Sequence, residues 1–376
     1  GRQGGDEILR QLACRLQNLS TYDDSVIARY TNSSIIVACR QTFKEMNIPQ
    51  QEMDELLFEP YYIHEKETYV TLKVGKSAFN KDEPFMEAIH QADTALSNAL
   101  KATGTVVKNF EQSHLESVEE EMNVLVHIPK GLKHNEFFPM LQPKVNIATG
   151  EIESFEALAR WISAEIGFVS PALFIPIAEN TGNIYKIDRE ILSNVLQWQQ
   201  NRMVLGRKPY QVSVNISPTH FYSPGFIESS VALIKSYEVD PKYIKFEITE
   251  SVELDNVKRA KKIISELKTH GIDTAIDDFG VGYSSLSYLQ ELPFEEIKID
   301  KSFVDYLADP RMNAVVKTII QLSKNLNMIS VAEGIETEEQ HEELKRMGCQ
   351  VGQGYYYYRP MPFDEIDKLL ADTVHM

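Results

Sequence analysis

The chain has little cysteine, no long apolar run and no run of basic residues. Three cysteines in 376 residues, with no Cys-x-x-Cys pair, argue against a disulfide framework or a zinc cluster and fit a reducing compartment such as the cytoplasm. No segment approaches the roughly 18 apolar residues of a membrane span, so we expect no membrane contact from this chain. The net charge of −17 opposes polymeric nucleic acid as a partner, although a small anion stays compatible where a bound metal inverts the local field.

The composition is that of a folded protein with more than one domain. Hydrophobic residues make up 43% of the chain and charged residues 25%, an ordinary globular balance that supports sizeable cores. We expect three segments, at residues 1–110, 111–135 and 136–376. The first residue is Gly1 rather than methionine. We therefore expect an excised fragment of a longer, sensor-linked or membrane-attached protein.

The first segment has the pattern of a small α+β domain. Residues 6–18 have helical periodicity, 26–30 and 34–39 read as two strands joined by a short polar turn, 69–74 as a further strand, and 84–102 as a helix. Residues 111–135 carry several glutamates interleaved with apolar residues, which predicts an acidic connecting helix. This helix is either a solvated linker or a signalling coiled coil.

Strands and helices alternate from residue 136 to the end. We expect helices near 171–181, 186–203, 224–237, 254–270, 284–291, 310–326, 337–347 and 363–371. The strand-like segments between them end on or near seven polar residues, which are Glu156, Asn215, Glu247, Asp277, Lys298, Glu333 and Gln353. Such alternation predicts an α/β fold with a parallel sheet, and functional residues at successive strand ends are typical of a (β/α)8 barrel, a TIM-like fold.

The types of these residues point to chemistry on a phosphate. Carboxylate and amide oxygens suit a hard divalent cation, and the set as a whole indicates metal-assisted hydrolysis of a phosphate ester. In isolation, the adjacent Asp277 and Asp278 read as a helix N-cap. The six other ligand-type residues at strand ends favour instead two nearby cations. Lys298 reads as a surface lysine by default, whereas strand alternation turns it inward, where it needs an anionic partner.

Several motifs carry a resemblance that covers about 240 residues. They are Gln142-Pro143-Lys144, Glu156-Ala157-Leu158-Ala159-Arg160, Ser213-Val214-Asn215, Glu247-Ile248-Thr249-Glu250, Asp277-Asp278-Phe279-Gly280, Lys298-Ile299-Asp300, Glu333-Gly334-Ile335-Glu336 and Gln353-Gly354-Tyr355. In this order and spacing they resemble the EAL-domain phosphodiesterases of bacterial cyclic di-GMP signalling. The family usually has threonine where this chain has Val281. The resemblance implies a barrel with one antiparallel strand near its start and hydrolysis of cyclic di-GMP to linear pGpG.

The resemblance also implies a role for each matched residue. Mg2+ or Mn2+ is expected at two metal positions, with Ca2+ inhibitory, and the implied ligands are Glu156, Asn215, Glu247, Asp277 and Asp278, together with Glu333 and Glu336 for the second metal. Lys298, Glu333, Glu250 and Gln353 are the implied catalytic group: Lys298 orients the water, Glu333 acts as base, Glu250 braces the 277–286 loop, and Gln353 holds a water or Glu333. Arg160, Gln142 and Asp300 are the implied substrate contacts.

One alternative concerns the class of protein, and one further expectation concerns its assembly. A receptor that binds cyclic di-GMP without cutting it is the rival to the enzyme, although such receptors usually lack ligands that this chain retains. The barrel helices beside the 277–286 loop are candidate contacts of a homodimer.

The first segment resembles a truncated GGDEF domain, the cyclase that makes cyclic di-GMP. Gly4-Gly5-Asp6-Glu7 imitates its signature, but the signature position follows Ala28-Arg29-Tyr30, where this chain has Thr31-Asn32-Ser33. Both acidic residues are missing there, and the Arg-x-x-Asp inhibition motif upstream is replaced by Tyr22-Asp23-Asp24-Ser25. We therefore expect a degenerate domain that is regulatory and makes no cyclic di-GMP.

Overall fold

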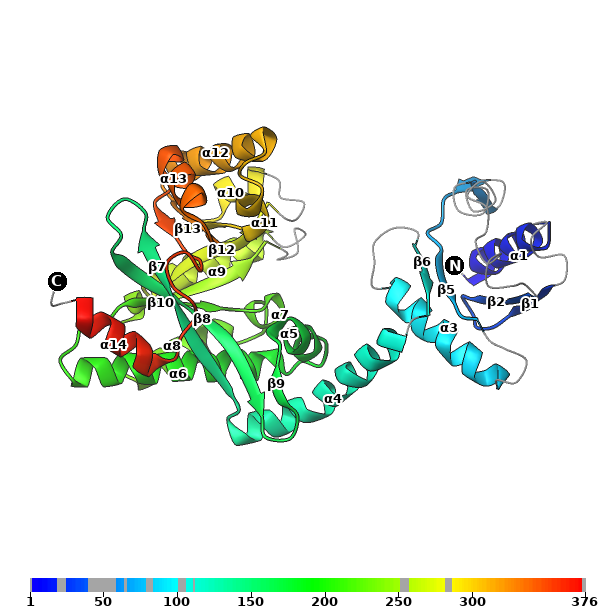
Figure 1. Cartoon of the computed structure of the whole chain (residues 1–376), viewed down its shortest axis with the longest axis horizontal. Helices are drawn as coiled ribbons and strands as arrows, with labels where there is room; N and C mark the ends of the chain where they lie inside the picture. Colours follow the sequence, from blue (N-terminus) through cyan, green and yellow to red (C-terminus); the bar gives the residue numbers. More distant parts are fainter. Residues whose placement is uncertain are drawn as a thin grey trace. The chain divides into compact units, whose positions relative to one another are not determined.

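The computed structural model divides the chain into two compact units, Gly1–Glu120 and Glu121–Met376 (Figure 1). It describes residues 2–18, 25–39, 59–63, 66–78, 84–100, 106–110, 112–250, 257–280 and 286–373. Among these residues, no helix combines the length and the apolar character needed to cross a membrane.

In its described residues, the first unit combines three short two-stranded sheets with helices. Its elements are α1 (Arg2–Asn18), β1 (Ser25–Arg29), β2 (Ile35–Cys39), β3 (Tyr61–Ile63), β4 (Lys66–Thr68), β5 (Lys73–Lys76), α3 (Phe85–Leu100) and β6 (Val106–Asn109). Strands β1 and β2 form the expected antiparallel hairpin. The strand expected at 69–74 is wrong in position, because the chain pairs only from Lys73, where β5 runs parallel to β6.

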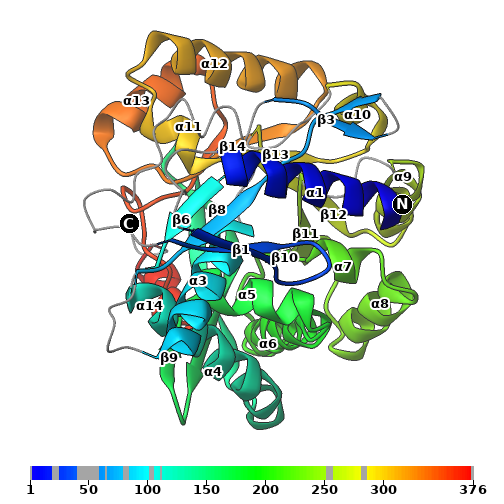
Figure 2. The same ribbon diagram turned by 90° about the vertical axis from the view of Figure 1, so that its right-hand side faces the viewer.

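A glycine allows helix α3 to pack closely on β5 in this unit (Figure 1), and Figure 2 shows the same helix beside β6. A Cβ added at Gly75 would lie 2.2 Å from the carbonyl oxygen of Ala92 and 2.3 Å from the backbone nitrogen of Leu96. Ala88, Ala95 and Ala99 on α3 are buried, and such small side chains also favour a short helix-to-strand distance. Helix α4 (Gln112–His134) follows β6 and lies within the expected connecting segment 111–135.

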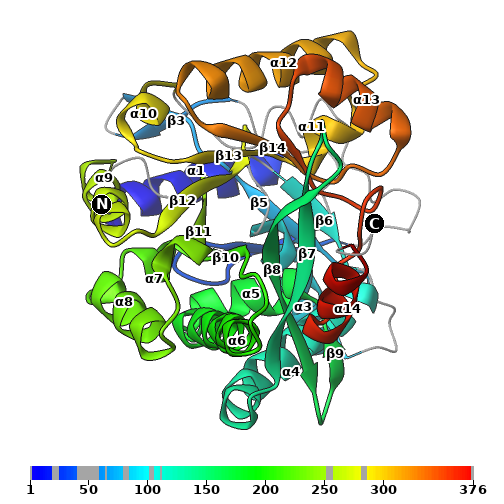
Figure 3. The ribbon, with the colours of Figure 1, turned by 90° about the vertical axis from the view of Figure 1, so that its left-hand side faces the viewer.

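The second unit is a closed barrel surrounded by helices (Figure 3). Among the described residues, eight strands close it: β7 (Phe137–Asn146), β8 (Ile152–Ser163), β10 (Gln211–Asn215), β11 (Ile244–Thr249), β12 (Asp273–Phe279), β13 (Glu296–Ile299), β14 (Ile329–Ala332) and β15 (Val351–Gly352). Strand β8 pairs with β10, which closes the ring, and β7 is antiparallel to both β8 and β15. The expected barrel and its antiparallel strand are confirmed.

Helices alternate with the parallel strands and cover the outside of the barrel. They are α5 (Pro171–Asn180), α6 (Ile184–Val204), α7 (Pro218–Phe221), α8 (Phe226–Ser236), α9 (Val257–Thr269), α10 (Leu286–Glu291), α11 (Lys301–Asp305), α12 (Pro310–Asn325), α13 (Glu338–Met347) and α14 (Phe363–Thr373), with a 3-10 turn at Pro241–Tyr243. Local signals explain several boundaries: α12 begins with Pro310 after the Asp309 cap, and Thr337 and Gln340 form a capping box on α13.

Alternation along the strands puts polar side chains inside the barrel. In β10, Val212 and Val214 belong to the hydrophobic core, while Ser213 and Asn215 bond to interior residues. In β13, Ile297 and Ile299 belong to the same core, while Glu296 and Lys298 point inward. Successive residues of a strand face opposite sides, so each strand supplies both the packing against the helices and the polar interior.

Candidate active site

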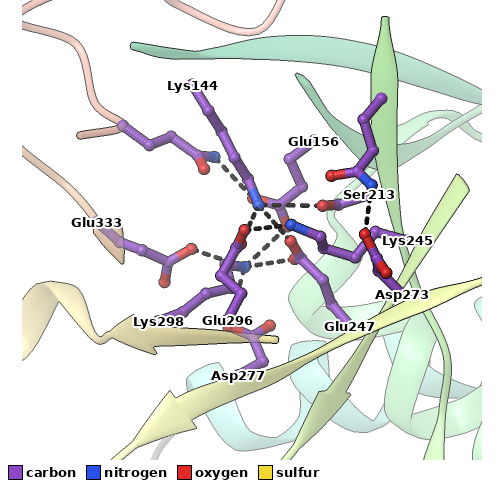
Figure 4. Close-up of polar contacts among 12 residues, drawn as sticks. Lys144, Glu156, Ser213, Lys245, Glu247, Asp273, Asp277, Glu296, Lys298 and Glu333 are labelled. Atoms are coloured by element: carbon purple, nitrogen blue, oxygen red, sulfur yellow. Dashed lines mark hydrogen bonds and ion pairs between the residues drawn. The ribbon is translucent and has the colours of Figure 1, made fainter. Parts of the chain in front are cut away.

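Among the described residues, acidic side chains from three strands and one strand end converge at one edge of the barrel (Figure 4). Oxygens of Glu156, Glu247 and Asp277 lie within 4.8 Å of one another, and so do oxygens of Asp277, Asp278 and Glu333. We call these five residues the carboxylate cluster. Asp277 is shared by the two groups, so the cluster has the arrangement of two adjoining oxygen-rich sites.

Lys298 lies at the centre of the carboxylate cluster (Figure 4). Its Nζ is 2.5 Å from Glu247 Oε2, 2.9 Å from Asp277 Oδ1, 2.7 Å from Glu333 Oε1 and 3.4 Å from Glu156 Oε1. Its side chain is only 1% exposed. The prediction that Lys298 faces inward and has an anionic partner is confirmed.

Amide side chains fix the orientation of Glu156. Asn215 Nδ2 donates to Glu156 Oε1 at 2.7 Å, and Gln353 Nε2 donates to Glu156 Oε2 at 2.7 Å. Gln353 also donates to Gln142 Oε1, and the amide of Gln142 donates in turn to the carbonyl of Tyr358. The structure therefore gives Gln353 a contact to Glu156 rather than to Glu333, and it surrounds Gln142 with protein partners.

A bulge in β12 lets two consecutive aspartates serve one cluster. The pairing of β12 with β13 shifts between Ile276 and Phe279, and Asp278 has a positive φ of 54°. In a regular strand Asp277 and Asp278 would point to opposite faces, whereas a left-handed residue at a bulge redirects its side chain. Just beyond, Gly280 N donates to Glu250 Oε2 at 2.8 Å, which agrees with the predicted bracing by Glu250; residues 281–285 of that loop lie outside the described part.

Burial and charge shift the pKa values of the cluster in opposite directions. Burial, with repulsion between neighbouring carboxylates, raises the pKa of Glu156, Asp277 and Glu333, the last well above its ordinary range. Burial also opposes the ionised form of Glu247, but the ammonium groups of Lys144 and Lys298 outweigh it and hold that pKa well below normal. Burial alone would lower the pKa of Lys298, yet the surrounding carboxylates raise it well above normal.

Four predicted residues have positions or local partners that their motifs did not indicate. Glu156 does not end its strand, because β8 continues to Ser163 in a long pairing with β7. Glu336 belongs to neither acidic group among the described residues and forms an exposed ion pair with Lys301. Asp300 caps α11 by accepting from Ser302 N at 3.0 Å. Arg160 is half-buried and donates to the carbonyl of Ala159.

A second set of buried residues, three charged and one polar, lies beneath the cluster and was missed from the sequence. Lys144, Ser213, Lys245 and Glu296, which we call the buried charge layer, are at most 4% exposed. Lys144 Nζ bonds to Glu247 Oε1 and to Glu296 Oε1, and Lys245 Nζ is 2.5 Å from Glu296 Oε2. The available signal was alternation: Lys245 precedes Glu247 by two positions, and Glu296 precedes Lys298 by two.

The donor set fits hard divalent cations. In the described residues of the carboxylate cluster and the buried charge layer, three lysines form ion pairs with five carboxylates. Without counting Asp278, this leaves a formal excess of two negative charges. Buried carboxylates that would hold a cation have raised pKa values when the cation is not bound, because they repel one another. Gln353 Oε1 is buried without a hydrogen-bond partner in the described structure, so it offers an acceptor to a water at this site.

The position of the cyclase signature in the first unit is the turn of the β1–β2 hairpin. Tyr30 N donates to Ser34 O at 3.0 Å, and the hydroxyls of Thr31 and Ser34 lie 2.6 Å apart. The side chains of this turn are hydroxyl and amide groups. The turn therefore lacks the adjacent carboxylates with which a cyclase of the resembled family would hold a metal and a nucleotide.

Comparison with known proteins identifies the parts of the chain. The model of the EAL domain matches residues 126–360, and that of the diguanylate cyclase GGDEF domain matches residues 1–105. The solved structure named PaMucR phosphodiesterase, c-di-GMP complex, is similar with a TM-score of 0.62 and 35% identity, covering 65% of this chain and 99% of that one.

Two curated relatives of Pseudomonas aeruginosa extend the likeness over nearly the whole chain. The bifunctional diguanylate cyclase/cyclic di-GMP phosphodiesterase MucR is 30% identical over 97% of this chain, and the cyclic di-GMP phosphodiesterase NbdA is 27% identical over 98%. The matches cover 54% of MucR and 48% of NbdA, so the chain spans about half the length of these relatives.

Proposed function

The chain belongs to the EAL domain family, and on this premise we propose that it hydrolyses cyclic di-GMP to linear pGpG with Mg2+ or Mn2+. The observation that carries the proposal is the carboxylate cluster around Lys298, with its two adjoining oxygen-rich groups. The names of MucR and NbdA and the c-di-GMP complex of the similar structure support the same substrate.

The residues of the cluster divide into two ligand groups. Glu156, Asn215, Glu247 and Asp277 would hold one cation, and Asp277, Asp278 and Glu333 a second. When bound, the cations stabilise charge on the phosphate and lower the pKa of a water. The buried oxygens of Glu156 and Glu247 need no reorganisation for this, because amide and ammonium groups already fix them.

Lys298 and Glu333 carry the proton and charge changes. Glu333 accepts the proton of the attacking water, and its contact with Lys298 Nζ at 2.7 Å holds it at the cluster. The water oxygen bonds to phosphorus, the bond from phosphorus to the ribose O3′ breaks, and that oxygen takes up a proton. The ammonium group of Lys298 offsets the negative charge of the phosphate as these bonds change.

The remaining predicted residues act around this centre. Gln353 orients a water through its free Oε1, and Glu250 braces the loop after β12. Arg160 contacts a phosphate or guanine of the substrate, with Gln142 and Asp300 as further substrate contacts. The GGDEF-like unit is non-catalytic and regulatory. A homodimer through the barrel helices stays a prediction, as does the cytoplasmic location.

The test is to incubate the purified chain with cyclic di-GMP and Mg2+ or Mn2+, and to separate the nucleotides by chromatography. Metal-dependent formation of pGpG that EDTA abolishes supports the proposal. A parallel titration of nucleotide binding in Ca2+ separates the rival, since tight binding with no product in any metal would identify a receptor and refute the enzyme.

A further inference from the structure

Lys144 is a buried lysine with no part in the proposed hydrolysis. It lies on β7, is fully buried, and its Nζ contacts Glu247 Oε1 at 2.6 Å, Glu296 Oε1 at 2.7 Å and Ser213 Oγ at 3.0 Å (Figure 4). An ammonium group has three N–H donors, so these three acceptors satisfy it completely. Lys144 is therefore sealed from solvent, and Glu247 is the residue of the carboxylate cluster that it contacts directly.

The two oxygens of Glu247 have different surroundings. Oε1 points to Lys144 in the buried charge layer, whereas Oε2 is 2.5 Å from Lys298 in the carboxylate cluster. The side chain of Glu247 is 0% exposed. A carboxylate held from below by its first oxygen presents only its second oxygen to the cluster.

We propose that Lys144 is a positioning residue that makes Glu247 a one-oxygen ligand and thereby favours Mg2+ over Ca2+ at this site. Mg2+ requires a compact octahedron of about six oxygens, whereas Ca2+ takes about 6–8 and readily accepts both oxygens of a carboxylate. Because Glu247 Oε1 bonds to Lys144, it cannot act as a second ligand oxygen for Ca2+, the larger ion. The inference rests on the proposed function, in which Glu247 holds a metal.

Orientation and charge have separable effects on metal affinity. Removing a buried ammonium group makes the site more negative, which strengthens the binding of every divalent cation by a similar factor. Freeing Oε1 acts differently on the two ions, because only Ca2+ gains from a second oxygen. The ratio of the Mg2+ and Ca2+ dissociation constants therefore reports orientation, and it is insensitive to a purely structural or electrostatic role.

The experiment measures Mg2+ and Ca2+ binding to the full chain by calorimetry without nucleotide. For Lys144→Met we expect the preference for Mg2+ over Ca2+ to fall about tenfold or more relative to the unmodified chain, within the usual range for groups that support a ligand. Lys245→Met is the matched control, because Lys245 lies in the same layer and pairs with Glu296. Its ratio should stay within about threefold.

A double variant protects the test against misfolding. Lys144→Met alone leaves Glu296 with one fewer partner, so Lys144→Met/Glu296→Gln removes one charge of each sign and keeps the net charge of the layer. The same fall in the ratio is expected. An unchanged ratio in either folded variant overturns the inference and leaves the proposed function intact, whereas an unmodified chain that binds no divalent cation overturns both.

Discussion

Replacing Lys298 with methionine should destabilise the metal-free barrel and make its stability strongly dependent on Mn2+. Methionine fills much of the same volume but removes the ammonium group that four carboxylates share. Breaking a buried ion pair by removing one partner costs about 3–5 kcal/mol. Proton uptake by carboxylates of raised pKa limits this loss at low pH, so the full effect is expected near pH 8.

The predicted loss can be read as a melting temperature. About 1 kcal/mol corresponds to about 2–4 °C for a domain of this size, so the metal-free variant should melt roughly 6–20 °C lower. Both tryptophans of the chain, Trp161 and Trp198, lie in the second unit, so intrinsic tryptophan fluorescence follows the barrel alone. Mn2+ replaces the missing positive charge, and it should therefore raise the melting temperature of the variant more than that of the unmodified chain.

A matched control uses a lysine of the same barrel edge. Lys301 pairs with Glu336 at the surface, where both side chains are 45% exposed. Exposed pairs contribute about 0–1 kcal/mol, so Lys301→Met should melt within about 4 °C of the unmodified chain with or without Mn2+. Equal melting temperatures for Lys298→Met and the unmodified chain in EDTA, or equal gains on adding Mn2+, would refute the reasoning.

Three further predictions concern the ligands, the pH dependence and the first unit. Glu156→Ala should lower the turnover of cyclic di-GMP by several orders of magnitude while the tryptophan fluorescence still reports a folded barrel; near-normal turnover would contradict the metal assignment. Burial raises the pKa of Glu156, Asp277 and Glu333 in the metal-free protein. Their protonated forms therefore stabilise the fold fully at pH values below the ordinary carboxyl pKa, and this stability is lost as the pH rises through the raised pKa values. Mn2+ must displace these protons, so its stabilising effect in melting experiments should grow from about pH 6 to about pH 8, and a gain that shrinks over this range would be inconsistent with the shifts. The purified chain should form no cyclic di-GMP from GTP in the presence of Mg2+ or Mn2+, and product detected by chromatography would show that the unit is not degenerate.

Much of the barrel and of its site could be predicted from local patterns. Strand–helix alternation gave the fold class, and polar residues at or near the strand ends marked the edge where functional groups gather. Asn215 does end β10, and Glu333 and Gln353 directly follow β14 and β15. Lys298 turned inward as alternation requires. These features depend on residues that are close in sequence, which is why a single chain reveals them.

Local patterns misled where a side chain had a nearer partner. Glu336 pairs with Lys301 and lies outside both acidic groups of the described residues. Asp300 accepts from the backbone of Ser302, and its contact with substrate stays a prediction. The contact of Gln353 with Glu156 rather than Glu333 joins β8 to the end of β15, strands that are not neighbours in the sheet. Such choices among several acceptors are made by distance in the folded barrel.

The sequence by itself determined which residues face the barrel interior and at which edge they gather, because side-chain alternation and strand direction are properties of the backbone. Only the tertiary structure decided which of them meet. Lys144 is 103 residues from Glu247 and 152 from Glu296, and its contacts depend on the stagger of the strands around the closed barrel. The same stagger places the buried charge layer two residues along the strands from the carboxylate cluster. There Lys144 bonds to Oε1 of Glu247 and leaves Oε2 facing the cluster.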